Sequence, residues 1–297
     1  VLAIAALEEG IITPQDKVFC SGRYRLGSRD FRCWRKAGHG SVDLHQAIVQ
    51  SCDVYFYQLG QRLGIKRIQD YAKRFGLGQR TGIGLDGEKT GLVPSPEWKR
   101  KRFGEPWYEG ETLIVSIGQG ALLVTPIQIV SLLSAVTNGG TLFAPRLVEK
   151  VESTDGKVFV ESASPHGDPV RFSSRTATIV RNALRDVVAS EKGTGKRARM
   201  EGVAVAGKTG TAQVIRMDDK KTPGDEIPLK ERDHAWFACY APAESPEIVV
   251  VVLVEHGGHG GETAAPIARE ILEEYFRSGQ ADETLAASPA SDVEVEG

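Results

Sequence analysis

The stretch EGVAVAGKTGTAQV, residues 201–214, decides between two kinds of fold. From Gly202 to Thr209 it matches G-x-x-x-x-G-K-T, the phosphate-binding loop of nucleotide hydrolases. Such a loop follows a strand and opens a helix. Here the Val-Ala-Val-Ala run before the lysine is itself strand-like, and Gly-Thr-Ala-Gln-Val-Ile after Thr209 is again extended in character. We therefore reject the nucleotide interpretation and place Lys208 in, or at the edge of, a β-ribbon.

The bulk composition is that of an ordinary globular protein. The 297 residues are 41% hydrophobic and 26% charged, enough for one large domain or two small ones. A net charge of −2 gives no electrostatic footprint for nucleic acid. No apolar run reaches the length needed to cross a bilayer, and no signal peptide is visible.

The order of predicted elements indicates an α+β fold. Helices are expected at about 43–62, 66–75, 126–138 (opened by Thr125-Pro126), 174–189 (capped by Ser173 or Ser174) and 263–277. Strands are expected at about 141–152, 157–161, 203–215, 234–241 and 248–255. Between them, 77–122 is rich in Gly and Pro, its run KRKRF is expected to be a solvated face, and the polar stretch 216–233 is long enough to overhang a cleft. Three consecutive late strands predict an antiparallel sheet flanked by helices, not a doubly wound parallel sheet.

The two ends of the chain differ from its middle. Val1–Glu9 has a helical pattern that ends at Gly10 but shows no N-cap and no first turn, so the domain is expected to be N-terminally truncated. Residues 278–297 are small and acidic without periodicity, which predicts a disordered tail. One domain is therefore expected over residues 1–277.

Two short stretches carry the chemistry. Lys208-Thr209-Gly210-Thr211 offers one cation and two hydroxyls, and Gly210 lets a ligand lie close to the backbone. This suits a carboxylate on an extended peptide that is added to the sheet edge. In QSCDVYFYQLG, residues 50–60, Ser51 and Asp53 precede an aromatic run. Alone they would be helix caps; together with the Lys208 strand they are interpreted as catalytic.

These motifs carry a family resemblance. Serine acyl-transferases of the penicillin-binding class combine S-x-x-K, S-x-N or S-x-D, and K-T-G. This chain has Ser51-Cys52-Asp53 and Lys208-Thr209-Gly210 in the same order. With GHGSVDLHQAIVQSCDVYFYQLGQRLGI, TGIGLDGEKTGLVPSPEWKRKRF, IGQGALLVTPIQ and AGKTGTAQV, it resembles the elongation-type class B penicillin-binding proteins (the penicillin-binding protein 2 group) over most of residues 1–275. The resemblance implies a penicillin-binding/serine β-lactamase-like transpeptidase fold.

One motif of the family is missing. No serine of this chain is followed three places later by lysine. In the family, the S-x-x-K serine opens the helix that Val1–Leu7 would end. The nucleophilic serine and its lysine base are therefore expected upstream of Val1, together with the membrane anchor.

The resemblance implies a peptidoglycan D,D-transpeptidase that cross-links stem peptides during cell elongation and is acylated by β-lactams. Ser51 would relay the serine's proton to the leaving amine, Asp53 would orient lysine and substrate, and Lys208 would supply positive potential. Thr209 and Thr211 would bind the terminal carboxylate, with the N–H of Thr211 in the oxyanion hole. Implied partners are a SEDS-family glycan polymerase and elongation proteins, at the bacterial inner membrane with this domain in the periplasm. A D,D-carboxypeptidase, a β-lactamase or a non-catalytic penicillin-sensing domain remain alternatives.

The cysteines point to a metal. Cys20, Cys33, His39 and Cys52 follow the spacing C-x12-C-x5-H-x12-C, and three thiolates with one imidazole make a closed tetrahedral zinc set. Some elongation-type relatives carry Asp, Asp, His and Cys at the matching places. In an oxidising periplasm, a Cys20–Cys33 disulfide is the alternative. Cys239 is expected to be a core thiol, and His256 and His259 solvated loop residues.

Overall fold

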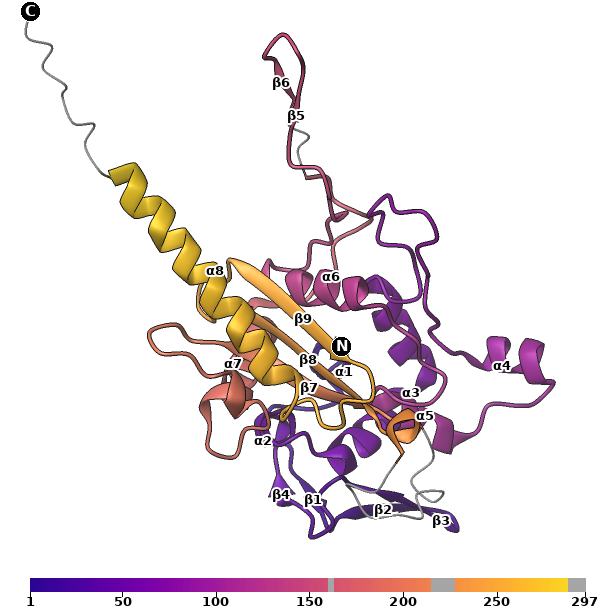
Figure 1. The fold of residues 1–297 in the computed structure, drawn as a ribbon. Coiled ribbons are helices and arrows are strands. Elements are labelled where there is room, and N and C mark those ends of the chain that lie inside the picture. The colour runs from indigo at the N-terminus through magenta and orange to yellow at the C-terminus, as the bar shows by residue number, and fades with distance from the viewer. Residues whose placement is uncertain (160–162, 215–227, 288–297) are drawn as a thin grey trace, which may run out of the picture.

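A three-stranded antiparallel sheet lies at the centre of the molecule (Figure 1). The computed structural model describes residues 1–159, 163–214 and 228–287. The sheet consists of β7 (Ala206–Ala212), β8 (His234–Ala241) and β9 (Ile248–Val254), in that order across the sheet. All three strands agree with the sequence prediction to within a few residues. Within the described part of the chain β7 has a strand on one side only, so it is an edge strand.

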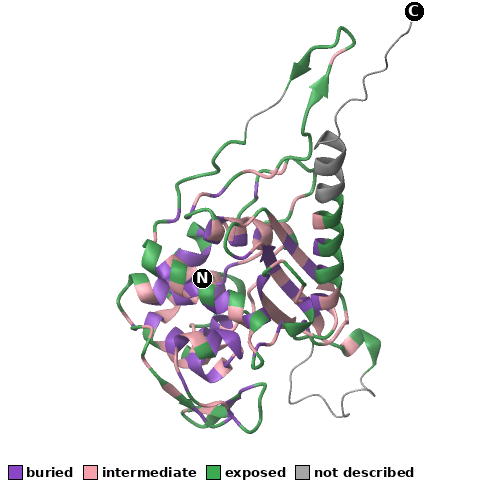
Figure 2. Cartoon of the chain, turned by 90° about the vertical axis from the view of Figure 1, so that its left-hand side faces the viewer, coloured by how far each residue is buried: buried purple, intermediate pink, exposed green. Residues whose placement is uncertain are grey.

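The two faces of the sheet belong to two apolar cores. Along β8, Ala235, Phe237 and Cys239 are buried in one cluster, whereas Tyr240, next to Cys239, is buried in the other. This alternation is the period-2 pattern of a strand with both faces covered. Figure 2 shows buried residues on the sheet and on the helices packed against it. The sheet is therefore a middle layer.

Helix α8 (Ala264–Ala287) covers one face of the sheet (Figure 1). Its residues Ala264, Ala265, Ala268 and Leu272 are buried at the positions expected of one helical stripe. The helix continues past the predicted end at 277, because SGQADETLAA contains several good helix formers. Residues 278–287 are thus helical, which corrects the predicted tail there, and 288–297 lie outside the described residues.

Helices α6 (Pro126–Thr137) and α7 (Ser174–Ala189) pack on the opposite face, and α1 (Leu2–Glu8) packs against α7. Both predicted starts are confirmed. Thr125 accepts from the N–H of Gln128 in a capping box, and Ser173 accepts from the N–H of Thr176. These caps satisfy backbone donors that a helix start leaves unpaired.

The segment predicted as one helix over 43–62 is interrupted. It forms α2 (Leu44–Val49) and the start of α3 (Asp53–Arg74), and the single-helix prediction is wrong at residues 50–52. The predicted gap before residue 66 corresponds to a kink in α3 at Gly64, whose φ is 76°. Glycine adopts this left-handed conformation without a Cβ penalty.

Two short helices lie in the Gly- and Pro-rich region 77–122: α4 (Pro96–Phe103) and α5 (Glu109–Ser116). Ser95 caps α4 and Pro96 opens it. The expectation that KRKRF is a solvated face is wrong for Lys99, which is only 6% exposed. Its ammonium lies 2.7 Å from Glu111 and 4.1 Å from the ring centre of Tyr108. Lys99 therefore ties α4 to α5.

The remaining strands are short. β1 (Val18–Cys20) pairs with β4 (Gly40–Val42), and β2 (Arg23–Leu26) with β3 (Arg29–Arg32). β5 (Val151–Glu152) and β6 (Val158–Phe159) form the predicted Asp155-Gly156 hairpin, which projects away from the body (Figure 1). Of the predicted strand 141–152, only Val151–Glu152 is a strand.

Three predicted segments lie partly outside the described residues: the strand 157–161 at residues 160–161, the strand 203–215 at residue 215, and the polar stretch 216–233 at residues 216–227.

Two 3-10 turns, η1 (Lys196–Ala198) and η4 (Leu229–Glu231), complete the described elements. None of the helices searched in the described residues combines the length and apolar character of a membrane span.

Candidate active site

Ser51 lies in the sharp turn between α2 and α3. Its N–H donates to the carbonyl of Ile48 (3.3 Å), and the next N–H, of Cys52, donates to Ala47 (2.9 Å). These two bonds form a Schellman helix end, whose left-handed residue is usually glycine. Ser51 takes that position with φ 53°, at a cost of roughly 1–2 kcal/mol for a residue with a Cβ. Serine therefore stands at a position that glycine usually takes, and the surrounding structure must hold it in this strained conformation.

That hydroxyl meets the lysine of the edge strand. Lys208 Nζ donates to Ser51 Oγ at 2.9 Å and to the carbonyl of Thr209 at 3.0 Å. Burial lowers the pKa of Lys208 to about 8, although the nearby charge of Asp53 opposes the shift. The ammonium is therefore held in a largely desolvated place, where it attracts an anion more strongly than it would in water.

Asp53 is the first residue of α3, two places after Ser51. The backbone N–H of Trp34 donates to its Oδ2 at 2.8 Å. Burial, followed by the charge of Cys33, raises the pKa of Asp53 to about 7, while Lys208 acts in the opposite direction. The structure thus brings the three predicted catalytic residues, Ser51, Asp53 and Lys208, into one site.

Thr209 and Gly210 are closely packed against neighbouring residues. The hydroxyl of Thr209 hydrogen-bonds that of Thr194 at 2.8 Å. A Cβ on Gly210 would meet Trp236 Cβ at 3.2 Å, so the missing side chain makes room for β8 rather than for a ligand. A Cβ on Gly260 would lie 2.5 Å from the Gly210 carbonyl, which explains one glycine of the EHGGHGG loop.

Gln119 lies against the outer edge of β7. Its Nε2 donates to the carbonyl of Thr211, and its Oε1 accepts from the N–H of Gln213 at 3.2 Å. In an antiparallel strand the N–H and C=O of one residue point the same way, so the N–H of Thr211 also faces this edge. The carboxamide of Gln119 therefore closes the edge from the Thr211 carbonyl to Gln213, at the C-terminal end of the Lys208-Thr209-Gly210-Thr211 stretch.

The four predicted metal ligands converge beside Ser51. One ligand atom each from Cys20, Cys33, His39 and Cys52 lie within 4.8 Å of one another. His39 Nδ1 is 3.6 Å from the Cys20 sulfur and 3.5 Å from the Cys33 sulfur. The turn before His39 requires glycine, because a Cβ on Gly38 would lie 2.2 Å from the Cys20 carbonyl.

All three sulfurs of this cluster are free thiols and buried. A hydrogen bond from Cys52, aided by backbone N–H groups, lowers the pKa of Cys33 to about 4 despite burial. The same hydrogen bond, together with burial, raises the pKa of Cys52. The hydrogen bond between the two sulfurs thus favours the deprotonated form of one of them, which is the form that binds a metal.

Comparison with known proteins fixes the family. The sequence model of the penicillin binding protein transpeptidase domain matches residues 1–273. The chain belongs to this transpeptidase family.

Individual relatives agree with the family. The peptidoglycan D,D-transpeptidase MrdA of Haemophilus influenzae is 37% identical over 285 residues, which cover 93% of this chain and 43% of the relative. The Pseudomonas aeruginosa PBP2 in complex with WCK 5153 has a TM-score of 0.80 at 37% identity, covering 92% of this chain and 58% of that one. A complex between PBP2 and MreC from Helicobacter pylori gives 0.76 at 29%, covering 93% and 48%. The chain spans less than half the length of the MrdA relative that it matches.

The transpeptidase fold predicted from sequence is thereby confirmed, and the nucleotide-hydrolase alternative is excluded. β7 is a strand on both sides of Lys208, as the sequence indicated. Cys239 is fully buried in the core beneath α8, as predicted, and burial raises its pKa to about 12. His259 is exposed as expected, whereas the N–H of His256 donates to Nδ1 of His234 at 2.9 Å.

The transpeptidase sequence motifs did not reveal three side chains of the site: Trp34, Gln119 and Thr194. Gln119 lies in IGQG, a stretch that carried the resemblance but no predicted role. Trp34 contacts the site through hydrogen bonds to residues 50–53, and Thr194 through one hydrogen bond to Thr209, and no local pattern encodes contacts between such separate segments.

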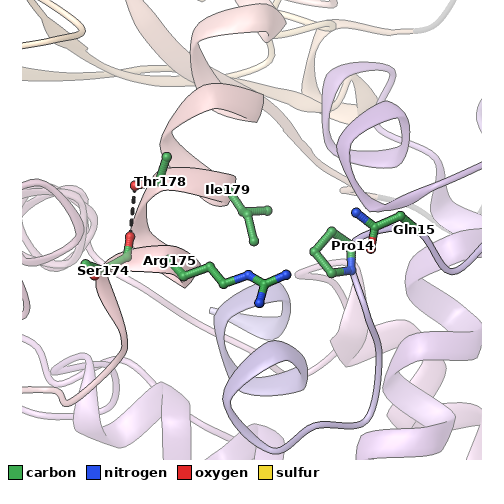
Figure 3. Close-up of a pocket in the computed structure, with 6 residues that line it drawn as sticks. All are labelled: Pro14, Gln15, Ser174, Arg175, Thr178 and Ile179. Atoms are coloured by element: carbon green, nitrogen blue, oxygen red, sulfur yellow. Dashed lines mark hydrogen bonds between the residues drawn. The ribbon is translucent and has the colours of Figure 1, made fainter.

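A shallow pocket of about 380 Å³ lies elsewhere, between the loop after α1 and the start of α7 (Figure 3). It is lined by Pro14, Gln15, Ser174, Arg175, Thr178 and Ile179, none of which belongs to the site above. Figure 3 shows Arg175 reaching across toward Pro14.

Proposed function

We propose that this chain is the transpeptidase domain of a peptidoglycan D,D-transpeptidase that cross-links stem peptides during cell elongation. The observation that carries the proposal is the contact of Lys208 Nζ with Ser51 Oγ at 2.9 Å, next to the outer edge of β7, which has no strand partner within the described part of the chain and which Gln119 covers only from Thr211 onward. An ammonium joined to a hydroxyl beside a free edge suits a peptide that ends in a carboxylate. The D-Ala-D-Ala end of a stem peptide is such a ligand.

Binding would use the outer edge of β7. The terminal carboxylate would lie near Lys208 and accept from the hydroxyls of Thr209 and Thr211. The scissile carbonyl would accept from the N–H of Thr211, which faces this edge. Each such donor contributes roughly 3 kcal/mol to stabilising the tetrahedral intermediate.

The chemical steps would be acyl transfer through a serine ester. The family's S-x-x-K serine, expected upstream of Val1, attacks the carbonyl between the two D-alanines while its lysine takes the proton. Ser51 passes a proton to the departing nitrogen, the C–N bond breaks, and D-alanine leaves as an amine. An amine of a neighbouring stem then attacks the ester, forms the cross-link and restores the serine. A β-lactam would acylate the same serine.

The setting of this reaction is also a proposal. MrdA relatives and a PBP2–MreC complex among the similar proteins support an elongation role. We propose elongation proteins and a SEDS-family glycan polymerase as partners, an anchor in the bacterial inner membrane, and a periplasmic position for this domain. The proposal that the glycan polymerase belongs to the SEDS family rests on the sequence resemblance.

We further propose one structural zinc ion on Cys20, Cys33, His39 and Cys52. With bond lengths of about 2.3 Å to sulfur and 2.0 Å to nitrogen, a tetrahedral site separates these atoms by about 3.5 Å. His39 Nδ1 lies 3.5 and 3.6 Å from two sulfurs, so the donor set fits. Four protein ligands leave no open position, and zinc would therefore order the loop rather than activate water.

Labelling of the intact protein with a fluorescent penicillin tests the function. We expect one covalent adduct per molecule that decays slowly, and a tryptic peptide carrying it from the S-x-x-K segment. Rapid release of the ring-opened penicillin would point to a β-lactamase instead. An adduct on any serine of residues 1–297 would show that the nucleophile has been misassigned.

A further inference from the structure

Trp34 stands out among the side chains that the catalytic motifs do not include. It directly follows Cys33, and the residue is 55% exposed. Nevertheless both of its N–H groups are used. The backbone N–H donates to Asp53 Oδ2 at 2.8 Å, and the indole N–H donates to the carbonyls of Ser51 (2.8 Å) and Gln50 (3.1 Å). Trp34 thus contacts the backbone of Ser51 and the side chain of Asp53 in the Ser51-Cys52-Asp53 motif.

The two carbonyls that the indole binds belong to a strained turn. They follow the last residue of α2, where helix carbonyls lose their intrahelical partners. Ser51 is left-handed there, with φ 53°, a conformation that persists only when its surroundings hold it. The indole N–H bonds the carbonyl on each side of the Ser51 φ and ψ angles, those of Gln50 and Ser51. A donor shared by these two carbonyls favours the left-handed conformation of Ser51 over a helical or extended one. The indole is therefore well placed to fix the direction of the Ser51 hydroxyl.

We propose that Trp34 is a positioning residue for the acyl-transfer site: its indole N–H holds Ser51 in the conformation that aims Oγ at Lys208, and its backbone N–H orients the Asp53 carboxylate. The effect of Trp34 on acyl transfer rests on the proposed function, whereas its effect on the conformation of Ser51 and Asp53 rests on the hydrogen bonds alone.

A purely structural role would look different. A tryptophan that fills a core is buried on both ring faces, and its contribution scales with that burial. Trp34 is more than half exposed and touches His39 edge-on, with ring centres 5.5 Å apart. The contribution of Trp34 to the site therefore comes from its indole N–H rather than from the apolar surface that its ring buries.

The same contacts join the cysteine loop to the catalytic motif. Trp34 is bonded to Cys33 and packs on His39, and both belong to the cluster of four candidate ligands. An ordered 33–39 segment therefore holds Ser51 through the Trp34 indole and holds Asp53 through the backbone N–H of Trp34.

The test removes one hydrogen-bond donor and keeps the ring. Trp34→Phe lacks the N–H, and 3-benzothienylalanine at position 34 replaces the N–H by sulfur in an indole-shaped ring, which guards against a folding defect. Trp98→Phe is the matched control, because no hydrogen bond from the ring N–H of Trp98 is found within the described part of the chain. Each intact protein is acylated with a fluorescent penicillin, and the acylation rate constant is separated from the dissociation constant of the noncovalent complex.

We expect both Trp34 variants to lower the acylation rate constant roughly tenfold, the worth of one well-placed hydrogen bond, and to leave the dissociation constant unchanged. Binding is spared because Lys208 and Thr209 still hold the carboxylate. The Trp98 control should match the wild type. Equal rates in wild type and both Trp34 variants would overturn the inference, as would a loss confined to the dissociation constant.

Hydrogen exchange measured by mass spectrometry gives a second readout that does not need catalysis. The amides of Ser51 and Cys52 are bonded within the turn, and we expect them to exchange faster in both Trp34 variants. If the wild type takes up no penicillin, the proposed function fails, and exchange at 50–54 alone then decides the role of Trp34. Unchanged exchange there would reject it.

Discussion

The ammonium of Lys208 lies 2.9 Å from the hydroxyl oxygen of Ser51, although the two residues are 157 positions apart. The contact joins a helical segment to the central sheet, since Ser51 lies in the turn between α2 and α3 and Lys208 lies on edge strand β7. Its environment is dry enough to lower the pKa of Lys208 to about 8. A partly buried ammonium with a hydroxyl partner is costly to folding but strengthens the binding of an anionic ligand.

Lys208→Ala should separate function from stability. Because the charge is desolvated, removing it relieves an unfavourable burial, so the melting temperature should change little. The acylation rate of the intact protein with a β-lactam should fall by roughly a hundredfold or more, as expected when a charge that meets the ligand is lost. Stopped-flow labelling and thermal denaturation measure the two effects.

Lys230→Ala is the matched control for Lys208→Ala, because Lys230 is an exposed lysine of η4. It should leave both the acylation rate and the melting temperature at wild-type values. An unchanged acylation rate in Lys208→Ala would remove the role assigned to this lysine.

The affinity for a carboxylate ligand should depend on pH through Lys208. The ammonium is charged below its pKa of about 8 and is lost as the pH rises through that value, so the inhibition constant of a D-Ala-D-Ala peptide should increase above pH 8. The folded pKa is depressed below the ordinary 10.5, so the unfolded chain binds more protons between these values. Stability from this group therefore rises with pH over the same window.

Lys208→Arg provides the comparison for this pH profile, since a guanidinium keeps its charge throughout. Its profile should lack the loss of affinity above pH 8. A wild-type profile that is flat from pH 7 to about 10 would contradict the assignment of the titration to Lys208.

Protein purified without added metal should contain close to one zinc ion per molecule. In Cys33→Ser one thiolate ligand is missing, so elemental analysis should show loss of most of the zinc, and loop 20–40 should exchange its amides faster. Thiol titration of the wild type under denaturing, metal-free conditions should count four free thiols, matching the four cysteines.

Cys239→Ala is the control for the metal prediction, because Cys239 lies in the core beneath α8, in a different cluster from the four ligands. It should keep its zinc. Metal-free wild type with a Cys20–Cys33 disulfide would replace the zinc proposal by the disulfide alternative.

Gln119→Ala should destabilise the C-terminal end of strand β7, which the Gln119 carboxamide covers. The substitution removes two hydrogen bonds, to Thr211 and from Gln213, and should lower the free energy of unfolding by about 1–2 kcal/mol in urea denaturation. Gln213→Ala is its control, because Gln213 contributes its backbone N–H and has an exposed side chain. Equal stabilities of the two variants would show that the Gln119 contact carries no free energy.

The sequence predicted the parts of this fold that repeat a local pattern. The strand around Cys239 alternates along most of its length, and the Val-Ala-Val-Ala run leads into the strand that holds Lys208. Thr125-Pro126 and Ser173 mark helix starts, so these elements could be located from neighbouring residues. The break at Ser51 could not, because its left-handed turn contains serine where glycine is the usual signal. The burial of Lys99 in KRKRF could not be predicted from neighbouring residues either, because its partner Glu111 lies on another helix.

The site divides in the same way. Ser51, Asp53 and Lys208 were predictable because they lie in short motifs with recognised spacing, and the structure brings them together. Trp34 and Gln119 were not, because each reaches the site by hydrogen bonds to backbone groups, and backbone groups carry no residue-specific pattern.

The cross-linking reaction itself tests the central claim most directly. The intact protein is incubated with a stem pentapeptide that ends in D-Ala-D-Ala and a second stem that offers a free amine, and the products are identified by mass spectrometry. We expect release of one D-alanine for each cross-linked dimer formed, and loss of both products in Lys208→Ala. Release of D-alanine with only the hydrolysed tetrapeptide, or no release at all, would contradict the assignment of this domain as a D,D-transpeptidase.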